Sequence, residues 1–299
     1  MKRRLSKQRI QILLGILLSV GLSIQGYQLL TAEVEGLPPA AEVTPAKVRP
    51  SQAFATPVPS TPAAAESLEA FAARDPIGFF DMLLDRYDRS VRDYTCTFTK
   101  QELIGGRLSS LQTMEAMFRE SPFSLRLTWI KNADKCSRVL YVAGQWIKNG
   151  QQMAVVEPGA IARLIVPYVM RPIHGTDARK SSRRTMDQFG LQNSLALTAK
   201  FSKLAREQNL EALAFVGHGK VKDRETLVFE RHLPYTGEEG VWPDRVLVVH
   251  IDKELLLPVL CQAYADDDKA VLLGHYQMSD IKLNVNLPDS TFTKEGMGL

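Results

Sequence analysis

The sequence predicts an α+β domain built on a large, strongly curved antiparallel sheet. About ten segments alternate apolar and polar residues with a period of two, whereas helical periodicity appears in only two places. The connections between neighbouring alternating segments are too short to contain a crossover helix, so these strands are predicted to run antiparallel.

The first 30 residues predict a membrane-targeting segment. Five basic side chains within the first nine positions precede an apolar run from Ile10 to Leu30. This order keeps the charge on the cytoplasmic side while the apolar part enters the bilayer. The nearest small-x-small cleavage site has the bulky Leu30 where a small residue belongs, which favours an uncleaved signal anchor over a cleaved signal peptide. Either form places the rest of the chain in the cell envelope, anchored in the inner membrane or secreted.

The remainder of the chain is close to neutral, so it gives no support to nucleic-acid binding. Five of the 37 lysine and arginine residues lie in the leader, so 32 oppose the 33 acidic residues elsewhere. Residues 31–66 are rich in Pro, Ala, Thr and Ser, which predicts a disordered, extended linker. Residues 67–299 remain, and they are enough for one domain with its own core.

This domain is predicted to open with a helix. Asp75 suits the N-cap position and Pro76 suits the first helical position. Ile77, Phe80 and Leu84 begin an apolar stripe at steps of three and four residues. The helix is therefore expected to pack one side against a broad apolar surface.

The strands follow this helix and resume after a break in the middle of the chain. Asn149–Gly150 between two apolar runs predicts a hairpin, and Ser121–Pro122 ends an earlier strand. The polar run 266–269 predicts a turn between two late strands over 258–265 and 270–278. Residues 281–287 alternate most clearly and predict a final strand.

The middle of the domain, residues 158–209, is predicted to be a helical, basic insertion. Leu197, Phe201 and Leu204 have helical spacing, and basic side chains outnumber acidic ones. The basic residues are candidates for a lip that meets anionic head groups or a partner. An ordinary solvated face is the alternative, and charge runs usually have that role. The candidates for the basic lip are Arg171, Arg179, Lys180, Arg183 and Arg184.

The order of these elements resembles a known superfamily. The first helix leads into Tyr94–Lys100, a glycine hairpin and Met114–Arg119, and later come Val248–Asp252 and Met278–Phe292. This order resembles the LolA/LolB-like periplasmic lipoprotein carriers, which include MucB/RseB-type sensor domains. It is most similar to a bacterial domain-of-unknown-function family of that superfamily, family 1571. The resemblance implies an unclosed half-barrel wrapped around helices, with an apolar cavity that takes lipid acyl chains.

The resemblance also implies which residues would line such a cavity. They are large apolar side chains at strand positions, namely Phe98, Phe123, Leu125, Leu127, Trp129, Leu140, Trp146, Phe215, Phe229 and Leu283. A solid core is the alternative, because large apolar side chains usually fill one. The predicted function is a non-enzymatic extracytoplasmic module that binds a lipid or lipoprotein acyl chains. A protein-binding or stress-sensing scaffold of the envelope, with a filled core, is the first alternative, and a hydrolase with an unrecognised site is the second.

The sequence predicts no catalytic residue, no metal site and no cofactor. It has no Gly-x-Ser-x-Gly, His-Glu-x-x-His or Walker-type motif, and its five histidines are scattered. Cys96, Cys136 and Cys261 lack CxxC spacing; Cys96 is expected to be a buried free thiol, and a disulfide between Cys96 and Cys136 is left open. The expected partners are a lipid or acylated protein, the membrane through the N-terminal segment, and a second envelope protein.

Overall fold

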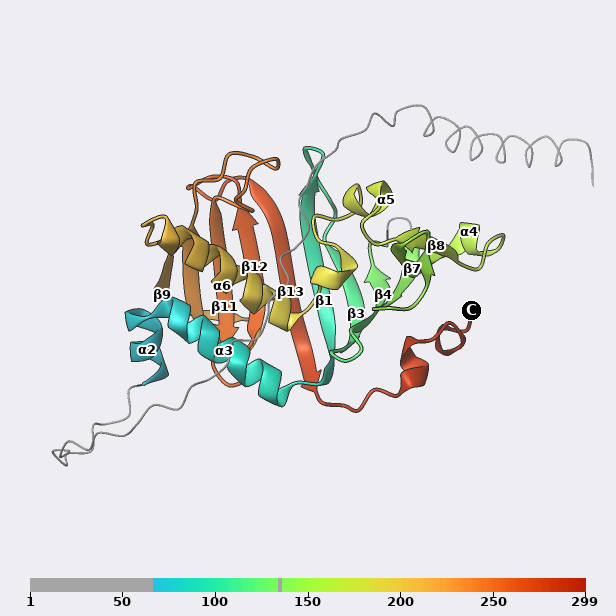
Figure 1. Ribbon diagram of the computed structural model, residues 1–299, viewed down its shortest axis with the longest axis horizontal. Coiled ribbons are helices and arrows are strands. Elements are labelled where there is room, and N and C mark those ends of the chain that lie inside the picture. The colour runs from blue at the N-terminus through green and yellow to red at the C-terminus, as the bar shows by residue number, and fades with distance from the viewer. Residues whose placement is uncertain (1–66, 134–135) are drawn as a thin grey trace, which may run out of the picture. The chain divides into compact units, whose positions relative to one another are not determined.

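The computed structural model describes residues 67–133 and 136–299, and these residues have the predicted α+β architecture (Figure 1). The predicted membrane segment and linker lie outside the described residues. Within the described part of the chain, none of the helices is both long enough and apolar enough to cross a membrane.

Thirteen strands form one antiparallel sheet. In sheet order they are β6 (Ile147–Lys148), β7 (Gln151–Pro158), β5 (Cys136–Val142), β4 (Ser124–Lys131), β3 (Gln112–Arg119), β1 (Asp93–Ile104), β13 (Leu272–Leu283), β12 (Pro258–Tyr264), β11 (Val246–Asp252), β10 (Arg224–His232) and β9 (Leu213–Val221). Two short strands lie off this path: β2 (Arg107–Leu108) pairs with β1, and β8 (Val169–Pro172) pairs with β7. Among the described residues the two ends of the order do not pair, so the predicted unclosed sheet is confirmed.

Two long helices lie on one face of the β9–β13 half of the sheet (Figure 1). They are α3 (Pro76–Ser90) and α6 (Leu191–Glu207), and the shorter α2 (Leu68–Arg74) precedes them. The Asp75 carboxylate accepts a hydrogen bond from the Gly78 N–H at 2.9 Å, which confirms the predicted cap of α3. The helical spacing after residue 190 is confirmed by α6, whereas α2 was not predicted.

The segment between β7 and α6 contains short elements only. These are α4 (Ala160–Arg163), β8, α5 (Thr176–Arg179) and the 3-10 turn η1 (Met186–Gln188). The segment therefore adds a strand to the sheet as well as the helical turns that the sequence predicted.

Two large cores fill the helix-covered face. The central core lies on β1, β3 and β4 beneath the start of α6, and it includes Tyr94, Phe98, Met114, Phe118, Leu125 and Leu191. The helix core lies between α2, α3 and α6 and the strands β9–β11, and it includes Phe79, Phe80, Leu195, Ala199, Phe229 and Val249. Burial of these apolar side chains is the main force that holds the helices on the sheet.

The last strand differs from the prediction of separate strands over 270–278 and 281–287. Instead, β13 is one continuous strand that ends immediately before Asn284, whose backbone is left-handed with φ 54°. The Asn284 side chain accepts a hydrogen bond from the Arg92 N–H at 2.9 Å and donates one to the Ser90 carbonyl at 2.8 Å. Asparagine tolerates this conformation, and the alternating pattern beyond it does not form a strand.

The C-terminal segment covers the opposite face of the sheet. It contains the 3-10 turns η2 (Asp289–Phe292) and η3 (Glu295–Met297). Phe292 and Met297 pack with Leu140, Val142 and Val155 in a third cluster, the C-terminal core. Because the side chains of a strand alternate between faces, β5 is buried on both sides.

Cys96 is a free thiol, so the disulfide between Cys96 and Cys136 that the sequence left open is not formed. Cys96 is buried as predicted, and this burial raises the pKa of its thiol to about 12.

Candidate functional site

The structure distributes the predicted cavity-lining residues over three cores. Phe98, Leu125 and Leu127 belong to the central core, and Phe123, Trp129 and Leu283 pack against it. Phe229 belongs to the helix core, and Phe215 packs against it. Leu140 and Trp146 belong to or pack against the C-terminal core on the opposite face. Eight of the ten residues therefore share the helix-covered face.

The predicted basic residues divide into two groups. Arg171, Arg179 and Lys180 are exposed, as a basic lip would require. Arg183 and Arg184 are partly buried instead. The Arg183 guanidinium pairs with the Glu238 carboxylate at 2.8 Å, so part of the basic surplus is neutralised within the protein.

The buried carboxylate of Glu102 binds the middle of the 158–209 segment to the sheet. The Glu102 side chain is 1% exposed and accepts hydrogen bonds from Lys100 Nζ at 2.8 Å, Ser182 Oγ at 2.9 Å and Tyr276 Oη at 2.8 Å. The Arg183 N–H also donates to it at 3.2 Å. These bonds join β1, β13 and the loop before α6, so the loop has a defined position against the sheet.

The helix-covered face also contains a buried ion pair that sequence reasoning missed. Arg231 on β10 and Asp244 are each 2% exposed at the side chain. Arg231 Nη2 donates to both Asp244 carboxylate oxygens, at 3.0 and 2.9 Å, and Nη1 donates to the Leu197 and Thr198 carbonyls of α6, each at 3.4 Å. Burial lowers the pKa of the Arg231 guanidinium, and the Asp244 carboxylate opposes that shift. The pair links the sheet to the middle of α6.

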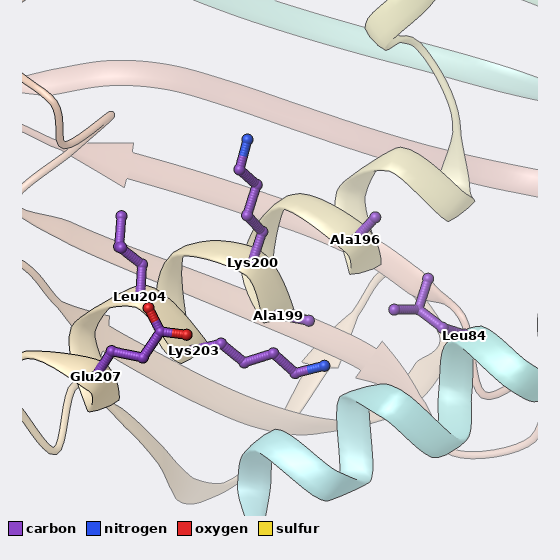
Figure 2. A pocket seen from close by; sticks show the side chains of 7 residues that line it. All are labelled: Leu84, Ala196, Ala199, Lys200, Lys203, Leu204 and Glu207. Atoms are coloured by element: carbon purple, nitrogen blue, oxygen red, sulfur yellow. The ribbon is translucent and has the colours of Figure 1, made fainter. Parts of the chain in front are cut away.

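An open groove of about 460 Å³ lies between α3 and α6, and it is called here the α3/α6 groove (Figure 2). It is lined by Leu84, Ala196, Ala199, Lys200, Lys203, Leu204 and Glu207. Figure 2 shows Leu84 of α3 pointing toward α6, and Lys203 extending into the gap between the two helices.

Small side chains create this groove. Ala196 and Ala199 lie three positions apart on α6, so both face the same side, and neither is large enough to fill the space toward α3. Polar contacts join the helices at the surface, where Lys203 Nζ lies 2.6 Å from Asp81 and Gln192 bonds Asp88 at 2.6 Å. The alanine spacing is the signal in the sequence that could have indicated this groove.

A second hollow of about 410 Å³ lies where α3 ends, and it is more polar. It is lined by Tyr87, Asp88, Val91, Arg92, Asp93, Arg119, Glu120, Ser121 and Gln192. Tyr87 Oη donates a hydrogen bond to Glu120, and burial raises the pKa of the Glu120 carboxyl. This lining suits a polar ligand rather than an acyl chain. None of the predicted cavity-lining residues borders this hollow or the α3/α6 groove.

In the part of the chain that the structure describes, no three His, Cys, Asp or Glu side chains gather where they could hold a metal ion. Two of the histidines, His218 and His250, have polar neighbours. His218 lies 3.7 Å from Glu69, and His250 Nδ1 lies 3.0 Å from Thr226 Oγ1. The Glu69 carboxylate also pairs with Lys253 Nζ at 3.0 Å, and the side chains of His218, Glu69 and Lys253 are all partly exposed.

A family model for proteins of unknown function, DUF1571, matches residues 91–296, which is more than half of the chain. The chain belongs to the DUF1571 family. This confirms the family predicted from the sequence. The match begins immediately after α3 and runs through the whole sheet to η3, so the family pattern contains α6 but not α3.

No curated protein is significantly similar to this DUF1571 chain. Several solved structures resemble it distantly. The MucA/MucB complex structure of Pseudomonas aeruginosa matches at 16% identity, with a TM-score of 0.41, over 73% of this chain and 60% of the other. A DUF1329 family protein from Desulfovibrio piger matches at 13% identity, with a TM-score of 0.38, over 74% of this chain and 99% of the other. The lipoprotein LppX of Mycobacterium tuberculosis matches at 11% identity, with a TM-score of 0.36, over 72% of this chain and 100% of the other.

Proposed function

We propose that this DUF1571 protein is a non-enzymatic, extracytoplasmic module that binds an apolar ligand, either a lipid or the acyl chains of a lipoprotein. One observation carries the proposal: the α3/α6 groove, with a volume of about 460 Å³, lies over the helix core. Ligand pockets commonly have volumes of about 300–1,000 Å³ and largely apolar linings. Ala199 belongs to both the groove lining and the helix core, so the apolar side chains of the helix core lie directly beneath the groove.

The groove has the two chemical parts that an acylated, anionic ligand requires. Leu84, Ala196 and Leu204 offer apolar surface for hydrocarbon. Lys200 and Lys203 border the same groove and offer positive charge to a phosphate or carboxylate. The ammonium group of Lys203 is bound to Asp81 at 2.6 Å, whereas Lys200 lies exposed, so Lys200 is the cation proposed to meet the head group.

Access to deeper apolar surface is proposed to occur by separation of the two helices. Their direct polar links, Lys203 with Asp81 and Gln192 with Asp88, lie near the surface, where such contacts contribute little free energy. Beneath them lies the apolar helix core. An acyl chain could replace the contacts that α3 and α6 make there with similar apolar contacts of its own.

Lipid extraction and mass spectrometry of the purified full-length protein test this proposal. Ala196→Trp fills the groove from a partly exposed position, so it is expected to leave the fold intact. The matched control is Ala73→Trp on the exposed surface of α2. Charged substitutions of Leu127 or Phe229 are poor tests, because these side chains are 6% and 0% exposed and the protein would unfold.

The proposal predicts co-purifying lipid or acylated peptide in the wild type and in Ala73→Trp. In Ala196→Trp the amount per protein should fall about tenfold, which corresponds to about 1.4 kcal/mol of binding free energy. Any lipid held by the N-terminal segment is common to all three proteins, so the difference reports on the domain. Equal lipid in the two variants would show that the groove is not the site.

A protein-binding or stress-sensing scaffold with a filled core is the second candidate. The observation that favours it is the burial of Phe98, Leu125, Leu127, Leu140 and Phe229, none more than 6% exposed, in packed cores. This candidate predicts wild-type protein free of ligand, with no uptake of an added fatty acid probe.

A further inference from the structure

The connection between β7 and β8 projects large apolar side chains away from the protein. Ile161, Leu164 and Ile165 are 84%, 85% and 73% exposed, and Val166 is 40% exposed. These four residues are called the apolar tip. Figure 1 shows α4 at the end of the sheet far from β9. Single exposed aliphatic residues are ordinary, but a contiguous exposed group marks an interaction surface.

The apolar tip is a defined turn. Backbone hydrogen bonds close it: the Arg163 N–H donates to the Gly159 carbonyl at 3.1 Å, and the Val166 N–H donates to the Ala162 carbonyl at 3.0 Å. The base is held by the sheet, where Val156 of β7 pairs with Val169 of β8. The turn therefore holds its apolar side chains outward instead of folding them onto the nearby cores.

Positive charge surrounds the apolar tip. From residue 158 to 176 the chain has two arginines, one histidine and no acidic residue. The nearest acid is Glu157, which is 1% exposed and pairs with both Arg138 and Arg163, the latter at 3.1 Å. Two guanidinium groups thus face one carboxylate at the base of the tip, which leaves a net positive charge there.

Two further cations lie on the flanks of the same connection. Lys294 Nζ donates to Tyr168 Oη at 3.2 Å and lies 4.6 Å from the centre of the Tyr168 ring. Arg171 is also half exposed, but the carboxylate of Asp177, 3.6 Å away, offsets its charge, so Lys294 and Arg163 carry the positive charge beside the tip. An exposed aliphatic tip within a cationic and aromatic border has the composition of segments that bind anionic lipid surfaces.

We propose that the apolar tip docks onto an anionic phospholipid bilayer, with Ile161, Leu164 and Ile165 among the acyl chains and Arg163 at the head groups. A bilayer fits better than a protein partner because the aliphatic side chains project on a single short turn and form no groove or flat patch. The predicted linker of residues 31–66 would keep the domain within about 120 Å of a predicted anchor, which raises the local concentration of lipid. This inference does not depend on the α3/α6 groove, since the two surfaces share no residue.

An environment-sensitive fluorophore tests the docking in the full-length protein. Leu164→Cys is labelled with NBD in a Cys136→Ser background. Cys96 is buried and Cys261 is partly buried, and burial raises the pKa of both thiols to about 12, so they react slowly with the label. The matched control carries the label at Val216, an aliphatic residue of β9 that is 55% exposed. Both proteins are added to vesicles of phosphatidylcholine alone or with about one third phosphatidylglycerol, a content chosen to give an anionic surface.

The expected result is a blue shift and protection from aqueous quenchers for the label at position 164 but not at 216. The effect should be larger on anionic vesicles and should weaken with salt. Adding Ile165→Asp should reduce the embedded fraction at least about tenfold, the lower end of what burial of one large aliphatic side chain provides.

Three results would overturn the proposal. The label at 164 could stay as accessible to quenchers as the label at 216 on both kinds of vesicle. Both labels could become protected equally, which would mean non-specific adsorption. The label at 164 could become protected without vesicles as protein concentration rises, which would assign the tip to contact between copies of the chain. Failure here leaves the groove proposal standing, because lipid extraction from Ala196→Trp measures a different surface.

Discussion

The buried pair of Arg231 and Asp244 gives a prediction whose magnitude follows from the structure. Both side chains are 2% exposed, and Asp244 accepts two hydrogen bonds from one guanidinium nitrogen. Asp244→Ala would leave Arg231 with two long bonds to carbonyls of α6, each 3.4 Å, and with Nε still unpartnered among the described residues. A buried charge without its partner destabilises a protein by about 3–5 kcal/mol.

The assay is urea unfolding of the wild type, Asp244→Ala, Arg231→Met and the double variant. Each single variant is expected to lower the free energy of unfolding by about 3–5 kcal/mol, because each leaves one charge buried and unpaired. The double variant should recover most of that loss, since methionine replaces the stem of Arg231 with apolar volume and no charge remains. The interaction energy of the cycle should therefore be large.

The matched control is the exposed pair of Arg89 and Asp85 on α3, whose side chains are 70% and 60% exposed. Substituting Asp85 by Ala should change stability by less than about 1 kcal/mol. The reasoning would be refuted if Asp244→Ala cost no more than Asp85→Ala. It would also be refuted if the double variant were as unstable as the sum of the two singles, because the pair would then contribute no coupling.

Three further predictions concern Tyr94 of β1, Gly190 at the start of α6, and the partly buried His250. Tyr94→Phe removes the acceptor of the Leu191 N–H bond, 3.3 Å long in a buried site, and should cost about 1–3 kcal/mol in urea unfolding. Gly190→Ala should cost about 1–2 kcal/mol in the same assay, since φ is 118° and a Cβ would lie 3.2 Å from Tyr94 Oη. Burial lowers the pKa of His250, so its contribution to the free energy of unfolding is complete above about pH 6.5 and is lost as the pH falls through the folded-state pKa. His250→Gln keeps a partner for Thr226 and should flatten this part of the plot of stability against pH. An unchanged slope would exclude His250 as its source.

Most of the sheet could be predicted from the sequence because local patterns determine it. Asn149 and Gly150 both have positive φ in the structure, 50° and 72°, as their hairpin requires. Cys96 and Phe98 are buried with Tyr94 on one face of β1, as their alternation predicted. Helix α3 likewise follows from its cap and stripe, which depend on residues close in sequence.

The candidate site could not be predicted in the same way, because alternation separates two faces without saying what covers each. Leu140 has the same character as Leu125, yet the C-terminal segment covers Leu140 and the central core contains Leu125. Arg231 lies two residues after Phe229 and so on the same buried face of β10, where the alternating pattern predicts an apolar side chain. The hydrogen-bonded carboxylate of Asp244 compensates the buried charge, and sequence alternation gives no sign of that contact. Contacts between residues far apart in sequence decide both cases.

The order of strands explains why the two proposed surfaces can be tested separately. The α3/α6 groove lies over the helix core on β9–β11, whereas the apolar tip extends from β7 and β8 at the other end of the sheet. Between them lie the central core and the pairing of β1 with β13, where Phe98 faces Met278. A tryptophan in the groove and an aspartate in the tip therefore share no neighbour, and effects of distant, unconnected substitutions add. If filling the groove also released the tip from vesicles, the sheet between them would have to transmit a change, and the two surfaces would then be parts of one lipid-handling device.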